Sequence, residues 1–320
     1  MGRVAYRNEL QKEGRNCLIG CYFHTDVAEA YVGAPLRMMV HEWFDDTLPA
    51  LAEIGEKFAD LAEARAEKYM GHLFELCDLA FASSPAQAAR LREYGVRDPH
   101  VVPLGVDLAL FDPSRRSEDI RIRHGANRDS LVLMYAGRLS TEKQVLVLVD
   151  ALQKLPADLR AVLWMVGHGP LHDEIQELSN HIETLHLLPY EADRVKFACM
   201  LSSAVIYVTA GPHETFGLSV IEAQASGLPV VGVDAGALRD RVPPDVGYLG
   251  PAGDAAAMVD NIVKAAANRS ALGARARLHV EAHLSWRNTF ETLLACYASE
   301  LERLLPELSP SAPLVVPGGA

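Results

Sequence analysis

Short apolar runs alternate with amphipathic segments along the second half of the chain, between about residues 130 and 265. Runs that are apolar at nearly every position predict strands buried on both faces, whereas half-exposed strands would alternate. Five such runs occur: Ser130–Ala136, Ala161–Val166, Thr184–Leu188, Ala204–Val208 and Pro229–Val233. Helical patterns separate them, at 143–155, 170–179, 191–202 and 217–226. This alternation predicts a parallel, doubly wound Rossmann-like sheet, which binds ligands beyond the carboxyl ends of its strands.

The first part of the chain has fewer strand signals but predicts an α/β domain too. Its candidate strands are Asn16–Phe23, Leu79–Ala82 and Val101–Pro103, with a long helical stretch over about 50–76 and a second helix opening at Ser83-Ser84-Pro85. Gly, Pro and mixed charge indicate a linker over about 105–129. We therefore expect a partial N-terminal domain at 1–113, a second domain at 114–285, a helix at 286–307 that packs back toward the first domain, and a flexible tail at 308–320.

Composition and charge narrow the function classes. The 320 residues are 49% hydrophobic and 22% charged, which is typical of a folded protein and not of a disordered one. A net charge of −12 repels phosphate backbones and anionic lipids, so general nucleic-acid binding is excluded, although a local basic patch can hold one diphosphate. No apolar run approaches the ~18 residues of a membrane span. Five scattered cysteines with no zinc spacing favour reduced thiols and a cytoplasmic location.

The segment Gly211–Pro229, GPHETFGLSVIEAQASGLP, carries the strongest chemical signal. Gly217 and Leu218 begin a predicted helix whose free backbone N–H groups suit a phosphate. Glu214 lies just ahead of that helix, and Glu222 lies about one turn inside it, where it can accept hydrogen bonds from two sugar hydroxyls. Glu222 has apolar neighbours and is expected to be buried, which is costly for a carboxylate without partners. A solvated or helix-capping role for the two glutamates is the alternative.

The segment Tyr135–Lys143, YAGRLSTEK, repeats the order of strand, glycine (Gly137) and helix start. Thr141 and Gln144 match a capping box. Lys143 in the first helical turn would lie at the positive end of the helix dipole, which is unfavourable for a cation. A bound anion would reverse this unfavourable interaction. Arg138 and Lys143 are therefore candidate anion ligands, with ordinary surface residues as the alternative.

Two further segments give weaker signals. Val166–Pro170, VGHGP, places Gly167 in another strand-to-helix turn, as a candidate wall for a nucleotide base. His24 ends the strand NCLIGCYF and is either a structural or a catalytic group. The chain contains no DxD, GxxxxGK[ST], GxSxG, HExxH or GxGxxG motif, so we expect no metal and no cofactor.

Together these segments resemble the retaining GT-B glycosyltransferases of family 4 (glycosyl transferases group 1). HETFGLSVIEA is similar to that family's E-x7-E motif, and YAGRLSTEK to its AGR-x4-K element. VVPLGVDLALFDP, LSWRNTFETLLACY and YFHTD resemble its interdomain signature, its closing helix and its Y-H-T-N/D variant. The resemblance covers almost the whole chain from about residue 16 and implies two Rossmann-like domains that face each other across a cleft.

The resemblance also implies a role for each candidate residue. Arg138 and Lys143 would hold the donor diphosphate, helped by backbone groups of Gly137, Gly167, Gly217 and Leu218. Glu214 would bind the transferred sugar, Glu222 the ribose, and His24 the sugar from the other domain. The implied reaction is hexose transfer, with retention and without a metal, from a UDP- or GDP-hexose to a hydroxyl of a glycan, lipid or small molecule.

The family pattern differs from this chain mainly at its start. Full-length members begin with strands and a glycine-rich loop that we do not find ahead of Val4–Gly14, which resembles the helix before the His24 strand. We therefore expect an incomplete N-terminal domain and, from its exposed sheet, self-association. The alternatives are a non-catalytic nucleotide-sugar binding remnant and, with no supporting feature, an epimerase or phosphorylase. The base, sugar and acceptor stay open, as does peripheral contact with the inner face of a membrane.

Overall fold

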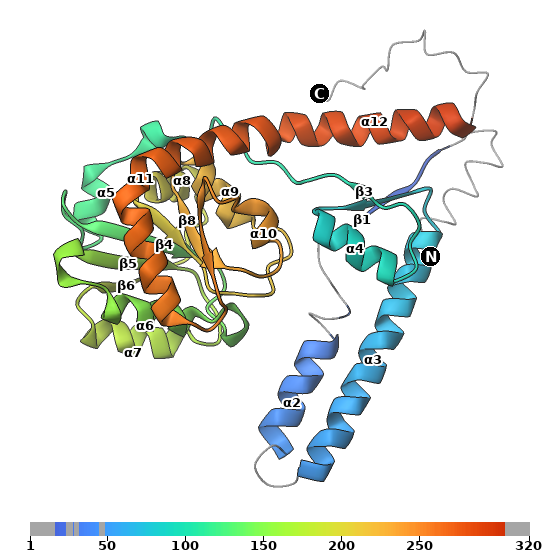
Figure 1. Ribbon diagram of the computed structural model, residues 1–320, viewed down its shortest axis with the longest axis horizontal. Helices are drawn as coiled ribbons and strands as arrows, with labels where there is room; N and C mark the ends of the chain where they lie inside the picture. Colours follow the sequence, from blue (N-terminus) through green and yellow to red (C-terminus); the bar gives the residue numbers. More distant parts are fainter. Residues whose placement is uncertain (1–16, 24–27, 29–31, 45–48, 305–320) are drawn as a thin grey trace. The chain divides into compact units, whose positions relative to one another are not determined.

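A computed structural model describes residues 17–23, 28, 32–44 and 49–304, and its contacts divide the chain into two units (Figure 1). The first unit comprises Met1–Ser83, Gln87–Val102 and Phe290–Ala320. The second comprises Ser84–Ala86 and Pro103–Thr289. The predicted helix at Val4–Gly14 and the tail at 308–320 lie outside the described residues.

The second unit is built on a six-stranded parallel sheet in the order β6-β5-β4-β7-β8-β9. All five predicted strands are confirmed, as β4 (Leu131–Ala136), β5 (Ala161–Val166), β6 (Leu185–Leu188), β7 (Ile206–Val208) and β8 (Val230–Val233). The sixth strand, β9 (Gly247–Gly250), was not predicted, because its short GYLG sequence is only half-buried and has no continuous apolar run. The strand order reverses between β4 and β7, and sheets of this kind bind ligands at such a point.

Helices separate these strands as the periodicity predicts. They are α6 (Val145–Lys154), α7 (His172–His181), α8 (Arg194–Ser203) and α9 (Leu218–Ala225), followed by the short α10 (Leu238–Arg241) and the long α11 (Ala255–His283). Every residue of β4, β5, β7 and β8 is buried, as expected for strands covered on both faces. α11 contacts α6 and α9 as well as β7, β8 and β9.

The segment expected to be a linker is part of the second unit. It forms a 3-10 helix, η2 (Pro113–Arg115), and the helix α5 (Glu118–Arg123), and Val106 and Phe111 lie in the core of the unit. The main boundaries between the units therefore fall after Val102 and after Thr289, whereas the sequence predicts boundaries at 113 and 285. The shift follows from these buried side chains, which the Gly- and charge-rich sequence around them concealed.

The first unit holds a three-stranded parallel sheet, β1-β2-β3. Its strands are β1 (Gly20–Phe23), β2 (Leu79–Ala82) and β3 (His100–Val101), and its helices are α2 (Ala34–Phe44), α3 (Pro49–Glu75), α4 (Pro85–Glu93) and most of α12 (Trp286–Leu304). Phe23 packs edge-to-face on Phe74 and Tyr94, and Phe81 packs against Tyr297 of α12. The two parallel sheets confirm the predicted α/β fold.

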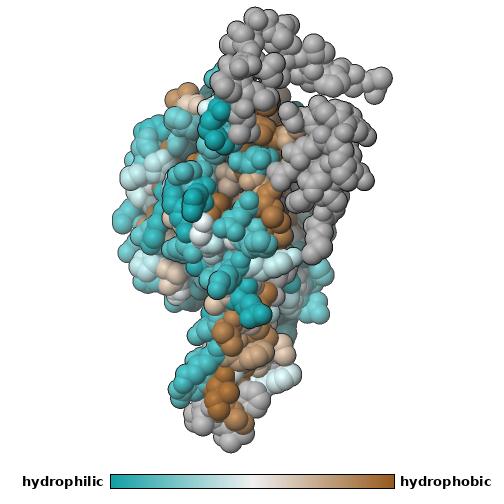
Figure 2. Space-filling model, turned by 90° about the vertical axis from the view of Figure 1, so that its right-hand side faces the viewer, coloured by the Kyte–Doolittle hydropathy of each residue, from teal (hydrophilic) through white to brown (hydrophobic). Residues whose placement is uncertain are grey.

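Large apolar side chains are exposed along α2 and α3. They are Met38, Met39, Trp43, Leu51, Ile54, Phe58, Leu61 and Tyr69. Figure 2 shows hydrophobic surface, in brown, in its lower part over α2 and α3. Neither of these helices, nor any other in the described part of the chain, is long and apolar enough to span a membrane.

Candidate active site

The turn after β4 places Gly137 and Arg138 at the carboxyl edge of the sheet. The Gly137 N–H donates to the carbonyl of Val166 over 3.0 Å, and the Tyr135 hydroxyl donates to the carbonyl of Arg138 over 2.8 Å. A Cβ on Gly167 would collide with the carbonyl oxygen of Gly137, and the φ of +151° at Gly167 disfavours any side chain. The two glycines therefore let neighbouring turns approach closely.

Lys143 is not in the first turn of an α-helix, so the predicted capping box at Thr141 and Gln144 is wrong. Thr141–Lys143 form a 3-10 helix (η3), Gln144 has a φ of +48°, and α6 begins only at Val145 without a side-chain cap. Lys143 therefore precedes the N-cap of α6 and does not lie in its first turn. The Lys143 Nζ instead lies 3.0 Å from Glu214 Oε2.

The Glu214 carboxylate joins Lys143 to the start of α9. Its Oε1 accepts a hydrogen bond of 3.0 Å from the N–H of Gly217, the N-cap residue of α9 with a φ of +83°. We expected this N–H to face a phosphate, but here a carboxylate of the chain itself accepts from it. Leu218, the first helical residue, is exposed. Lys143, Glu214 and Gly217 thus form one polar cluster ahead of α9.

Glu222 is buried, as predicted, with 9% of its surface exposed. Its Oε1 accepts a hydrogen bond from Arg194 Nη2. Burial raises the pKa of Glu222, and the hydrogen bond and positive charge of Arg194 act in the opposite direction. The guanidinium of Arg194 also lies over the rings of Phe111 and Phe197, at 5.0 and 5.4 Å from their centroids.

Arg194 was not predicted as a site residue. It is the first residue of α8, after the N-cap Asp193, and no motif surrounds it. The predicted burial of Glu222 implied that its carboxylate has a partner. Arg194 is 28 positions away in the sequence, and only the fold brings it to Glu222.

A cavity of about 370 Å³ lies at the carboxyl ends of β4 and β5, and we call it the carboxyl-edge cavity. It brings together four of the predicted residues, Gly137, Arg138, Gly167 and Glu222, with Arg194, Phe197, His168, Tyr190, Glu191 and Ser219 among its other lining residues. Lys143, Glu214, Gly217 and Leu218 do not line it. His24 lies outside the described residues. Its volume is within the usual range for a small-molecule site.

No metal site is evident in the part of the chain that the structure describes, where no three His, Cys, Asp or Glu side chains form a group that could hold an ion. All five cysteines are half-buried. The charged groups of the cavity are Arg138, Arg194, Glu191 and Glu222, and Lys143 and Glu214 lie ahead of α9.

Comparison with protein families shows which group this part of the chain is similar to. Residues 130–268, which contain the cavity and both glutamates, match the model described as "Glycosyl transferases group 1". We call this matched segment the group 1 domain. The predicted family is thereby supported at the level of the group, and the group 1 domain includes every strand from β4 to β9.

Curated relatives extend the similarity beyond the group 1 domain. A GDP-mannose-dependent alpha-(1-6)-phosphatidylinositol dimannoside mannosyltransferase of Mycobacterium tuberculosis is 34% identical over 220 residues, which are 67% of this chain and 55% of that protein. A D-inositol 3-phosphate glycosyltransferase of Geodermatophilus obscurus is 32% identical over 257 residues, 75% of this chain and 56% of that protein. The chain thus spans a little over half the length of these relatives.

Solved structures confirm the GT-B-type fold. Sucrose-phosphate synthase from Thermosynechococcus elongatus has a TM-score of 0.67 at 23% identity, covering 94% of this chain and 71% of that one. Anabaena HepE, solved with UDP and glucose, has a TM-score of 0.65 at 18% identity, covering 92% and 89%. At these identities the likeness concerns the fold alone.

Proposed function

We propose that this protein is a hexosyltransferase that moves a sugar, with retention, from a nucleotide-diphosphate donor to a hydroxyl group. The observation that carries the proposal is the carboxyl-edge cavity of the group 1 domain, which combines Arg138 with the buried Glu222 and its exposed partner Arg194. The curated relatives named above are a mannosyltransferase that depends on GDP-mannose and an inositol-phosphate glycosyltransferase.

The charges suit a departing nucleotide diphosphate. Arg138 lines the cavity where strand β4 ends, and Lys143 follows five residues later with its amino group beside Glu214. Cations fixed in advance near a leaving phosphate stabilise the negative charge that develops on it. We propose that Lys143 leaves Glu214 and binds the diphosphate when the donor enters. Glu214 is then free to bind the transferred sugar, and the Gly217 N–H is free to donate to the phosphate.

Glu222 suits the ribose of the nucleotide. An ionised carboxylate is a pure acceptor, so it can take hydrogen bonds from two neighbouring hydroxyls. Arg194 already occupies Oε1 and opposes the effect of burial on the pKa of Glu222, so it favours the ionised form that binding needs.

Calorimetric titration with UDP, GDP and ADP tests the binding half of the proposal. We expect one nucleotide to bind and the Glu222→Ala variant to bind it about 10–100-fold more weakly, as the loss of hydrogen bonds to a charged acceptor predicts. Glu177→Ala removes an exposed carboxylate from α7 and is the matched control. Unchanged affinity in Glu222→Ala would refute the assigned role.

Turnover tests the catalytic half. Arg138→Ala should lower the rate by about 10²–10³-fold, the effect of removing one charge-stabilising donor. Normal turnover in this variant would contradict the proposal. The configuration of the product, read by NMR, tests retention, and unchanged turnover in EDTA tests the proposed independence of metal.

Binding without transfer or hydrolysis would instead support a nucleotide-sugar binding protein. The acceptor class, a cytoplasmic location and contact with a membrane surface remain proposals.

The exposed apolar residues of α2 and α3 support the proposed self-association, and a monomer by light scattering would exclude it.

A further inference from the structure

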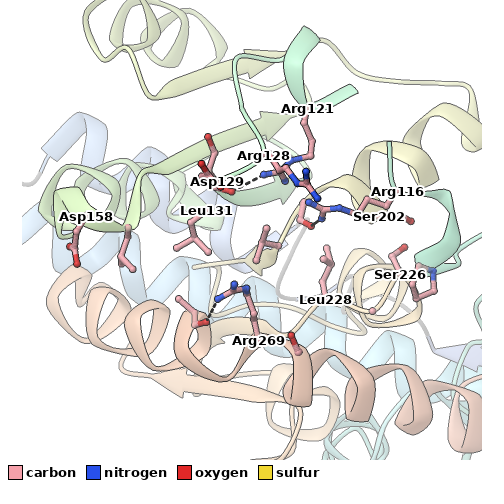
Figure 3. Close-up of a pocket in the computed structure, with 18 residues that line it drawn as sticks. Arg116, Arg121, Arg128, Asp129, Leu131, Asp158, Ser202, Ser226, Leu228 and Arg269 are labelled. Atoms are coloured by element: carbon pink, nitrogen blue, oxygen red, sulfur yellow. Dashed lines mark hydrogen bonds between the residues drawn. The ribbon is translucent and has the colours of Figure 1, made fainter. Parts of the chain in front are cut away.

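A second pocket, of about 560 Å³, lies at the opposite edge of the large sheet (Figure 3). Leu131 at the start of β4, Val205 just before β7 and Leu228 just before β8 line it. Residues that begin parallel strands lie at the amino edge, whereas the carboxyl-edge cavity lies where strands end. The two sites are therefore separate, and the role proposed for the group 1 domain does not involve the second.

This pocket is rich in arginine, and we call it the arginine pocket. Arg116, Arg121, Arg128 and Arg269 line it, against the two carboxylates Asp129 and Asp158. Figure 3 shows Arg116, Arg121 and Arg128 on one side of the pocket and Arg269 reaching from α11 on the other. A surplus of positive charge here contrasts with the net charge of −12 of the whole chain.

Arg121 is structural. It is 0% exposed, and its guanidinium donates to the carbonyls of Ser203 and Ser130 over 2.7 Å and of Asn127 over 2.8 Å. Burial, followed by the positive charge of Arg116, lowers the pKa of Arg121. Glu118 lies 3.3 Å from Arg116 Nε and 3.4 Å from Arg121 Nε, so one carboxylate serves two guanidinium groups.

Arg128 and Arg269 remain available for a ligand. Among the described residues Arg128 has no ion pair or hydrogen bond, and Arg269 donates only to the carbonyl of Ala266, over 2.9 Å. Asp129 lies 3.5 Å from Arg160, which is not a lining residue. Arg128 and Arg269 are both exposed. They therefore do not hold the fold together as the buried Arg121 does.

A buried hydroxyl provides an independent observation. Ser226 lines the arginine pocket with 3% of its surface exposed, and its Oγ has no hydrogen-bond partner in the described structure. Buried polar atoms in proteins are nearly always paired, so an unpaired one suggests a missing partner. Ser270 adds a further hydroxyl to the lining, whereas the hydroxyls of Ser130 and Ser202 already bond to Asn127 and to the carbonyls of Asp112 and Ala198.

We propose that the arginine pocket binds a phosphate monoester, with Arg128 and Arg269 as its principal ligands. Guanidinium groups form paired, charge-assisted hydrogen bonds with phosphate oxygens. The volume exceeds that of a phosphate ion, and the hydroxyls of Ser226 and Ser270 suit a hydroxylated group attached to it. The ligand class is therefore a phosphorylated sugar, with free phosphate as the smaller alternative source of the same group.

Calorimetric titration of the full chain with mannose 6-phosphate and with inorganic phosphate tests this proposal. We expect saturable binding, tighter for the sugar phosphate, and at least about tenfold weaker binding in Arg128→Gln/Arg269→Gln. If inorganic phosphate binds more tightly than mannose 6-phosphate, the proposed site is supported and the free ion is its ligand.

Two variants serve as controls. Arg123→Gln removes an exposed arginine of α5 that does not line the pocket, and Arg138→Gln alters the carboxyl-edge cavity. Both should retain phosphate binding. No saturable binding to the wild-type chain, or loss confined to Arg138→Gln, would overturn the proposal. Neither result depends on whether the chain binds a nucleotide.

Discussion

Replacing Arg194 by methionine removes the charge that faces the buried carboxylate of Glu222 but keeps a long side chain over Phe111 and Phe197. Burial holds the pKa of Glu222 above its ordinary value of 4.5, and Arg194 limits that rise. Without Arg194 the pKa of Glu222 should rise further. The native protein would then hold the Glu222 proton up to a higher pH.

The sign of the effect on stability follows from this direction. The pKa of Glu222 is higher in the folded protein than in the unfolded chain. The unfolding free energy therefore falls as the pH rises from 4.5 through the pKa that Glu222 has in the folded protein. A hydrogen bond to a charged group contributes about 1.5–3 kcal/mol, and we take the lower end because the Arg194 side chain is 53% exposed. Arg194→Met should therefore cost about 1.5 kcal/mol at pH 7 and much less at pH 4, where Glu222 is protonated in both states.

Urea unfolding between pH 4 and pH 8 measures this difference, and nucleotide titration over the same range measures its consequence. As the pH is lowered, Arg194→Met should lose nucleotide affinity at a higher pH than the wild type does. The reason is that Glu222 becomes protonated earlier in the variant, and only ionised Glu222 is a pure acceptor. In the Glu222→Gln background the same substitution should cost less than about 0.5 kcal/mol. Equal pH profiles in the wild type and Arg194→Met would refute the reasoning.

Three further substitutions test other parts of the second unit. Gly167→Ala forces a Cβ against the carbonyl of Gly137 and should lower stability by about 1–3 kcal/mol, measured as a lower Tm. Arg121→Met leaves two buried carbonyls and one partly buried carbonyl without their donor and should cost about 3–5 kcal/mol in urea unfolding; a cost under 1 kcal/mol would contradict its structural role. Glu214→Gln should change stability by less than about 1 kcal/mol, because its pair with Lys143 is partly exposed, but should slow sugar transfer while nucleotide binding persists.

Local patterns predicted most of the large sheet because burial on both faces leaves a direct record in the sequence. β4 and β5 are wholly apolar runs and were placed within one residue of their ends. β9 lacked such a run, and α5 lay in a segment whose glycine and charges indicated a linker. The cap at Thr141 failed for a different reason: a capping box is a local rule, and Gln144 adopts a left-handed conformation that the rule does not consider.

The sequence by itself determined the residues of the candidate site that follow strands β4, β5 and β7, since in a parallel sheet the order of elements fixes which loops share the carboxyl edge. It also determined that Glu222 is buried, from its apolar neighbours.

Only the tertiary structure decided the partners. Arg194 reaches Glu222 from another helix, Glu214 joins Lys143 to Gly217, and the arginine pocket combines residues near 116–128 with Arg269. Side-chain partners depend on how helices pack across the sheet, and that packing brings together residues whose separation in the chain leaves no periodic pattern to detect.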